Sequence, residues 1–153
     1  MISFVVPGSV VPWARARGEG SARFTPVRQR SYAGVIRASA WQAMRAQKPL
    51  DEPLELRVLA VWPWPTSLSA KRRAPGVSTC KATKPDADNV LKIVKDACTG
   101  IVWTDDARVA VLRAAKLYSD RPGLMVTVRP VDLREWPFTA SAQGNLLQEA
   151  WAA

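Results

Sequence analysis

The sequence predicts an α+β fold in which a mixed β-sheet is packed by two main helices. Several short stretches are β-branched or alternate between apolar and polar residues, and two longer stretches carry apolar residues at helical spacing. The chain has 153 residues and 48% hydrophobic content, which suits one domain with a substantial core. We expect the order strand, helix, strand, helix, strand, strand within residues 1–130, followed by a C-terminal extension, 131–153, without an assigned role.

The first strand and the first helix are predicted from their boundaries. Ile2 to Val6 is short and β-branched, and Pro7-Gly8 ends it. Residues 10–26 carry arginines and few regular signals, which indicates an exposed basic loop. Thr25-Pro26 is typical of a helix start, so we expect a helix to about Gln47. Its expected apolar face comprises Tyr32, Val35, Ile36, Trp41 and Met44.

The middle of the chain predicts a strand followed by a long loop. Alternation from Leu54 to Val61 indicates a strand with one face better buried, formed by Leu54, Leu56, Val58 and Ala60. Trp62-Pro63-Trp64-Pro65 ends this strand. Thr66 to Lys84 is expected to be a loop, and a loop of this length is usually functional or disordered.

The second helix and the last two strands follow this loop. Pro85 to Cys98 predicts a helix with an apolar stripe of Val90, Leu91, Val94 and Ala97. Val109 to Tyr118 and Leu124 to Val128 are predicted strands. Turn residues 120–123 separate them, so we expect these two strands to pair as an antiparallel hairpin.

The charge of the chain favours a polyanionic partner. It has 22 Lys and Arg against 13 Asp and Glu, a net charge of +9. Phosphate contacts release condensed counterions, which makes nucleic acid the leading partner class. An anionic membrane surface is the competitor, but no basic amphipathic helix is evident. A soluble basic domain with no DNA role is a further alternative.

The residues that are absent or rare restrict the chemistry. The sequence contains no histidine, which excludes Ser-His and Cys-His pairs and histidine metal ligands. Cys80 and Cys98 match no zinc spacing, and we expect Cys98 to be a buried thiol in a reducing cytoplasm. The apolar start of the chain is too short for a signal peptide, and no stretch is long enough to span a membrane.

The candidate chemistry lies in an acidic cluster within this basic chain. Asp86 and Asp88 flank the start of the second helix, and Lys92 follows Asp88 by one turn on the same face. Carboxylates hold Mg²⁺ through oxygen, and a lysine can add a positive charge beside a phosphate. The alternative is that Asp86 and Asp88 only cap the helix, and that Asp105-Asp106 is an ordinary loop before a strand.

These residues together resemble a known family. The run Pro85-Asp86-Ala87-Asp88-Asn89-Val90-Leu91-Lys92, followed by Asp96-Ala97, Gly100-Ile101-Val102-Trp103 and Asp105-Asp106, resembles the signature of the RusA family of Holliday junction resolvases, which are crossover junction endodeoxyribonucleases. Val5-Val6-Pro7-Gly8 with Pro12 and Arg15-Ala16-Arg17 is similar to the opening of the family. The resemblance spans Ile2 to Pro130.

The resemblance implies a Mg²⁺-dependent endonuclease, with Mn²⁺ as a substitute ion, that acts in DNA recombination and repair. The family implies a homodimer that makes paired nicks in four-way DNA junctions and is often phage- or prophage-borne. By position, the metal-binding acids would be Asp86, Asp88 and Asp106, with Lys92 as the essential lysine. Asp105 is the weaker candidate for the third acid.

The basic surface and the tryptophans complete the predicted site. Candidate DNA contacts are Arg15, Arg17, Arg23, Lys71, Arg72, Arg73, Lys81 and Lys84. Trp13 is a candidate for stacking on an exposed base. We expect Trp41 and Trp62 to lie in the core, and Trp103 to pack beneath the acidic pair. A nuclease for other branched or single-stranded DNA and a non-catalytic branched-DNA-binding module are the alternative functions.

Overall fold

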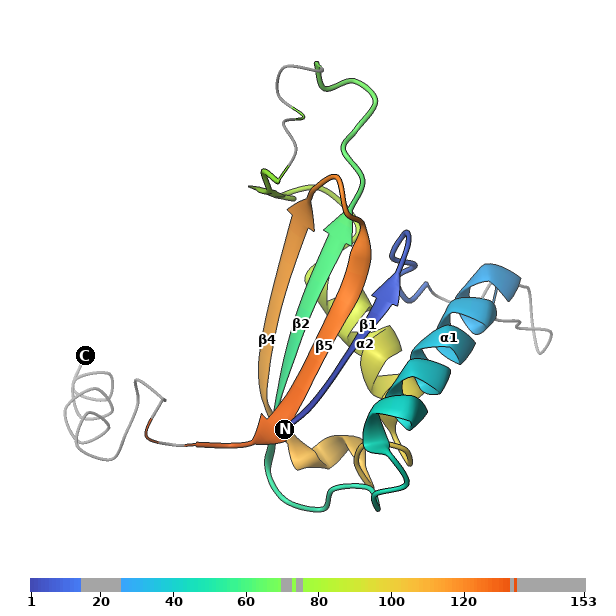
Figure 1. Cartoon of the computed structure of the whole chain (residues 1–153), viewed down its shortest axis with the longest axis vertical. Coiled ribbons are helices and arrows are strands. Elements are labelled where there is room, and N and C mark those ends of the chain that lie inside the picture. The colour runs from blue at the N-terminus through green and yellow to red at the C-terminus, as the bar shows by residue number, and fades with distance from the viewer. Residues whose placement is uncertain (15–25, 70–72, 74–75, 133, 135–153) are drawn as a thin grey trace, which may run out of the picture.

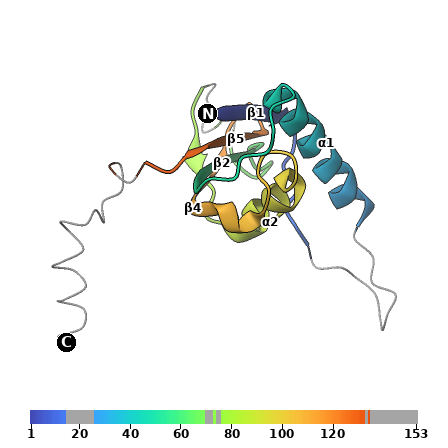
Figure 2. The same cartoon turned by 90° about the horizontal axis from the view of Figure 1, so that it is seen from below.

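The computed structural model describes residues 1–14, 26–69, 73, 76–132 and 134. They form a mixed five-stranded sheet with two α-helices on one side of it, as Figures 1 and 2 show. The predicted α+β fold class is therefore confirmed. No described helix has the length and apolar character needed to cross a membrane.

The elements follow the predicted order with two additions, a short strand and a 3-10 turn. In chain order they are β1 (Ile2–Pro7), α1 (Val27–Met44), β2 (Leu54–Trp62), β3 (Thr79–Cys80), α2 (Ala87–Cys98), a 3-10 turn (Asp106–Arg108), β4 (Val109–Tyr118) and β5 (Gly123–Pro130). The short strand β3 lies inside the segment that was predicted to be loop throughout. Two residues are too few to produce a recognisable alternation in the sequence.

The strand order is β1-β5-β2-β4-β3, and it contradicts the predicted hairpin. β5 pairs antiparallel with both β1 and β2, whereas β4 pairs parallel with β2. The turn residues 120–123 reverse the direction of the chain, but they do not determine which strand pairs with β5. Gly123 belongs to β5 opposite Pro7, and a Cβ atom there would lie 3.1 Å from the carbonyl oxygen of Val6. This glycine therefore permits the close approach of β1.

The core lies between the sheet and the two helices. The predicted buried face of β2 is confirmed, since Leu54, Leu56, Val58 and Ala60 are all buried. On α2, Val90, Val94 and Ala97 are buried as expected, together with Ile93 and Cys98, while Leu91 is only partly buried. Cys98 is a buried thiol as predicted, and desolvation raises its pKa to about 12.

The predicted face of α1 is partly wrong. Tyr32, Ile36 and Met44 are buried, but Val35 and Trp41 are 47% and 67% exposed. Gln29 and Ala40 complete the buried face instead. The buried stripe keeps a spacing of three or four residues, and Trp41 lies one position outside it. Trp62 packs against the core as a partly buried residue.

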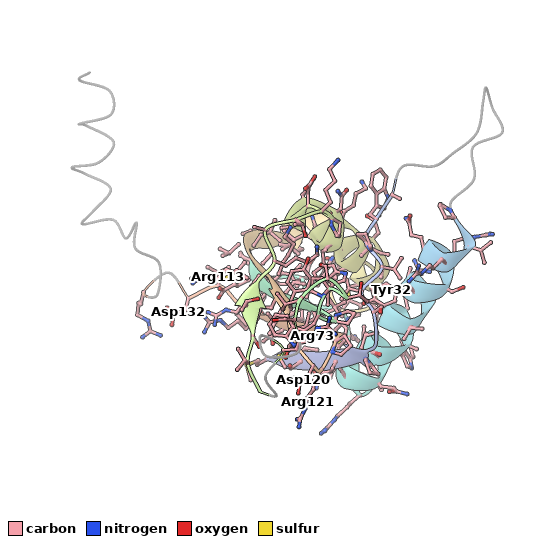
Figure 3. All side chains as sticks on the ribbon, turned by 90° about the horizontal axis from the view of Figure 1, so that it is seen from above. Tyr32, Arg73, Arg113, Asp120, Arg121 and Asp132 are labelled. Atoms are coloured by element: carbon pink, nitrogen blue, oxygen red, sulfur yellow. The ribbon has the colours of Figure 1, made fainter. Side chains whose placement is uncertain are left out.

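The opposite face of the sheet carries a buried acid that the alternation pattern assigned to the less buried side. Glu55 is 3% exposed, and its carboxylate pairs with Arg57, Arg113 and Arg129 at 2.9, 2.6 and 2.7 Å. The hydrogen bond from Arg57 outweighs the effect of desolvation and, with Arg129, lowers the pKa of Glu55 to about 2. Figure 3 shows Arg113 on the side of the molecule away from Tyr32 of α1.

Candidate active site

The acidic motif lies at the N-terminal end of α2. Asp86 occupies the N-cap position with an extended backbone (φ −72°, ψ 154°), and its side chain makes no capping hydrogen bond. Asp88 follows in the first helical turn, and both side chains are exposed. Helix capping therefore does not account for Asp86.

A cavity of about 480 Å³ brings the predicted residues of this motif together. It is lined by Trp13, Ala14, Asp86, Asp88, Asn89 and Lys92. Its acids come from the start of α2, and Lys92 lies one turn further along the helix. Two carboxylates and one ammonium thus share a single open cavity. The catalytic and metal-binding roles of these residues remain predictions.

Trp13 forms one wall of the cavity. Its backbone N–H donates to the carbonyl oxygen of Asn89 at 2.9 Å, and the Lys92 Nζ atom lies 4.7 Å from the centroid of its ring. The next residue, Ala14, donates its N–H to Oε1 of the buried Gln29 on α1 at 2.9 Å. This segment is therefore fixed to both helices. The base-stacking role of Trp13 remains a prediction.

Asp106 lies beyond the C-terminal end of α2. Its Oδ1 accepts hydrogen bonds from the Thr99 hydroxyl and from Trp103 Nε1, the latter at 3.0 Å. Its Oδ2 lies 3.6 Å from Lys95 Nζ. Desolvation raises the pKa of Asp106, but the bonds from Thr99 and Trp103 and the charge of Lys95 lower it further, so the net shift is downward. Trp103 is fully buried beneath it, as expected.

Asp106, the third predicted acid, contacts the face of α2 that carries Asp88 and Lys92, but it lies outside the cavity. Asp88, Lys92 and Lys95 follow one another at spacings of four and three residues, so they share a face of α2. Lys95 lies about 10 Å from Asp88 along the helix axis. Among the residues that the structure describes, no three acidic or cysteine side chains gather into a group able to hold a metal. The role of Asp106 remains a prediction.

Asp105 has a separate structural role. Its side chain accepts a hydrogen bond from the backbone N–H of Ala107 at 2.7 Å and so caps the short 3-10 turn. The two neighbouring acids therefore make different contacts, since Asp106 faces α2 and Asp105 caps the turn that leads into β4.

Comparison with known proteins identifies the family. The family model described as Endodeoxyribonuclease RusA matches residues 7–129. The chain belongs to the RusA family. It is also 33% identical over 139 residues to a Bacillus subtilis (strain 168) protein named "Uncharacterized protein YqaN", covering 85% of this chain and 96% of that one. The predicted membership in a family of endodeoxyribonucleases that resolve Holliday junctions is confirmed.

The basic residues of this RusA-family chain differ in how they are placed. Lys84 is exposed and directly precedes the acidic motif. Arg73 is partly buried, and its guanidinium donates to the carbonyl oxygen of Thr66. Five predicted contacts lie outside the described residues: Arg15, Arg17, Arg23, Lys71 and Arg72.

Lys81 does not lie on the surface where it was expected. It is 7% exposed, and its ammonium donates to Thr83 Oγ1, to the carbonyl oxygen of Lys84 and to Tyr118 Oη. The Nζ atom also lies 5.4 and 4.9 Å from the ring centroids of Trp62 and Tyr118. All three donors of the ammonium are engaged within the protein. This placement contradicts a surface contact with phosphate.

The sequence reasoning missed Lys116 on β4. Its Nζ donates to the carbonyl oxygens of Thr83 at 2.9 Å and Pro85 at 2.7 Å, next to the acidic motif. The available signal was a lysine at a strand position that shares its face with Leu112 and Ala114. Leu112 and Ala114 are exposed, so this strand pattern gave little sign that Lys116 has backbone partners.

Proposed function

We propose that this RusA-family chain is a divalent-metal-dependent endonuclease that resolves four-way DNA junctions by paired, symmetric nicks. The observation that carries the proposal is the cavity in which Asp86, Asp88 and Lys92 converge within a protein of net charge +9. A non-catalytic DNA-binding module would not require two exposed acids beside a lysine, because carboxylates repel phosphate.

The residues at this cavity fit Mg²⁺, with Mn²⁺ as a substitute. The carboxylates of Asp86 and Asp88 offer hard oxygen ligands, and Mg²⁺ commonly takes one or two carboxylates together with water and phosphate oxygens. The absent capping bond leaves the oxygens of Asp86 available. A bound ion would lower the pKa of a water molecule and stabilise charge on the reacting phosphate. We propose Asp106 as the third acid of this site.

The chain itself would bind the DNA and position it. Lys92, held against the ring of Trp13, would place a positive charge beside the phosphate at the cavity. Arg15, Arg17 and Arg23 follow Ala14, a residue of the cavity wall, within nine positions of the sequence. Those arginines, with Lys71, Arg72, Arg73 and Lys84, would contact the phosphate backbone without reading its sequence.

The symmetry of the substrate supports a homodimer. A four-way junction has approximate two-fold symmetry, and a two-fold dimer presents one cavity to each of two opposing strands. Paired nicks follow directly from that arrangement. A nuclease for other branched DNA would use the same cavity. Comparing the cleavage of junctions, flaps and linear duplexes separates the two functions.

The test is cleavage of labelled synthetic four-way junctions, flaps and linear duplexes in Mg²⁺ by the wild-type protein, by Asp88→Asn and by Glu52→Gln. Glu52 is a suitable control because it is an exposed acid that does not line the cavity. We expect symmetric nicks in the junction from the wild type and from Glu52→Gln, and none from Asp88→Asn. Equal activity of Asp88→Asn would refute the site, and preferential cleavage of flaps or linear duplex would refute the substrate.

A further inference from the structure

We infer that Lys81 and Lys116 are positioning residues that clamp the backbone of residues 83–85 and so fix Asp86 at the cavity. Three consecutive carbonyl groups directly precede Asp86, and each accepts a hydrogen bond from a lysine ammonium. Lys116 holds the carbonyls of Thr83 and Pro85, and Lys81 holds that of Lys84. The importance of Asp86 for metal binding rests on the proposed function, whereas the clamp itself rests on these contacts.

The clamp is anchored to the edge of the sheet. Lys116 belongs to β4, and its backbone carbonyl accepts the N–H of Lys81 at 2.8 Å, directly after β3. Tyr118, also on β4, accepts from Lys81 at 3.0 Å, and its hydroxyl lies 2.8 Å from Thr83 Oγ1. The segment before Asp86 is therefore tied to a rigid element at several points.

A contribution to folding stability does not explain why the Lys81 side chain is buried. The ammonium is almost fully buried, yet its three hydrogen-bond acceptors are two hydroxyl oxygens and one carbonyl oxygen, all of them uncharged. Burying a charge without an opposite charge carries a large desolvation penalty. Aromatic faces at 5.4 and 4.9 Å recover part of this penalty. The hydrogen bond from Lys81 instead holds the backbone in place at Lys84.

A fixed backbone matters at this place because of the ion that the site would hold. Mg²⁺ demands near-ideal octahedral geometry, so its affinity falls when a ligand can move. Asp86 precedes the first residue of α2, so its position depends on the segment that enters the helix. Loss of groups that orient metal ligands typically lowers metal affinity by about 10- to 100-fold.

The test uses the full-length protein with Lys116→Met, Lys116→Arg and a matched control, Lys48→Met, at an exposed lysine after α1. Lys81→Met is a further variant, but its burial makes Lys116 the primary position. Mn²⁺ binding without DNA is measured by electron paramagnetic resonance. We expect about tenfold weaker binding for Lys116→Met, wild-type binding for Lys48→Met and partial recovery for Lys116→Arg, whose guanidinium can also donate to carbonyl groups.

Backbone ¹⁵N relaxation in the metal-free protein tests the clamp independently of any metal. We expect lower order parameters at the amides of Thr83, Lys84 and Asp86 in Lys116→Met, with no change at α1. Unchanged relaxation would overturn the inference. Unchanged Mn²⁺ affinity together with weaker junction binding in EDTA would also overturn it and would make Lys116 a phosphate contact. If the wild type bound no Mn²⁺ while the relaxation still responded, the proposed function would fail and the clamp would stand.

Discussion

The carboxylates at the two ends of α2 differ in the contacts that they make within the protein. At the N-terminal end, Asp86 makes no capping bond and lies exposed at an open cavity beside Asp88. At the C-terminal end, Asp106 accepts bonds from Thr99 and Trp103 and pairs with Lys95. A carboxylate with several partners contributes to folding, whereas one without them contributes little. The comparison therefore predicts that stability and activity depend on different acids.

The largest expected effect is on activity at the open end. Asp86→Asn should lower kcat/KM for junction cleavage on the order of a thousandfold, because a neutral amide is a poor ligand for Mg²⁺. The thermal midpoint should stay within about 1 °C of the wild type, because no capping bond is lost. Single-turnover cleavage and thermal unfolding measure the two quantities. A large fall in the thermal midpoint would break the comparison.

Glu55 should show the opposite behaviour, because it is a buried acid far along the chain from the motif. Glu55→Gln leaves three arginines around a neutral group, and the pKa shift from 4.5 to about 2 corresponds to roughly 3 kcal/mol of stability at neutral pH. Chemical denaturation at pH 7 measures this loss. Mn²⁺ binding should remain that of the wild type, and a loss of binding would contradict the separation of the two roles.

The same shift fixes a dependence on pH. Because the pKa of Glu55 is lower in the folded protein, its contribution is fully present above about pH 4.5 and is lost as the pH falls toward 2. The difference in unfolding free energy between the wild type and Glu55→Gln should therefore shrink across this range. A constant difference between pH 5 and pH 2.5 would show that folding does not lower the pKa of Glu55.

Asp106→Asn tests the comparison further, because Asp106 has partners within the protein but is also partly exposed. The amide oxygen still accepts from Trp103 but no longer attracts Lys95, so the expected loss of stability is about 1 kcal/mol. If Asp106 is also the third metal ligand, Mn²⁺ affinity should fall as well. Lowered stability with unchanged Mn²⁺ affinity would restrict Asp106 to a structural role.

The smallest expected effect concerns the cavity wall. Trp13→Leu removes the aromatic face over which the Lys92 ammonium lies, an interaction worth about 0.5–1 kcal/mol at an exposed site. We expect a several-fold lower kcat with little change in Mn²⁺ affinity. Trp41→Leu is a suitable control, since Trp41 is an exposed tryptophan on α1. Equal effects of the two substitutions would remove Trp13 from the site.

Local patterns in the sequence predicted the fold class, the helices and the longer strands. The motif from Asp86 to Lys92 was also recoverable, because its spacing on a helix is a local property. The partners of β4 and β5 were not, because a turn signal shows that the chain reverses and not which strand lies beside it. Trp41 was predicted to lie on the apolar face of the first helix, but one helical position decides its exposure.

Long-range contacts explain the remaining differences at the site. Lys81 looked like one more charge in a basic loop, and only its contact with Tyr118 on β4 shows that it is buried. Lys116 was overlooked because its acceptors, the carbonyls of Thr83 and Pro85, lie more than thirty positions earlier in the chain. Asp106 lies with Lys95 because the chain turns back after α2, a geometry that the signature residues do not specify.

The parallel pairing of β2 with β4 has a consequence for how the protein is made. These strands are joined by a crossover of more than forty residues, and that crossover contains the whole acidic motif. Closing so long a loop is slow, and strands with distant partners tend to pair late in folding. The segment before Asp86 acquires its anchor on β4 only after that pairing. A nascent or partly folded chain would therefore lack the contacts that hold the backbone before Asp86.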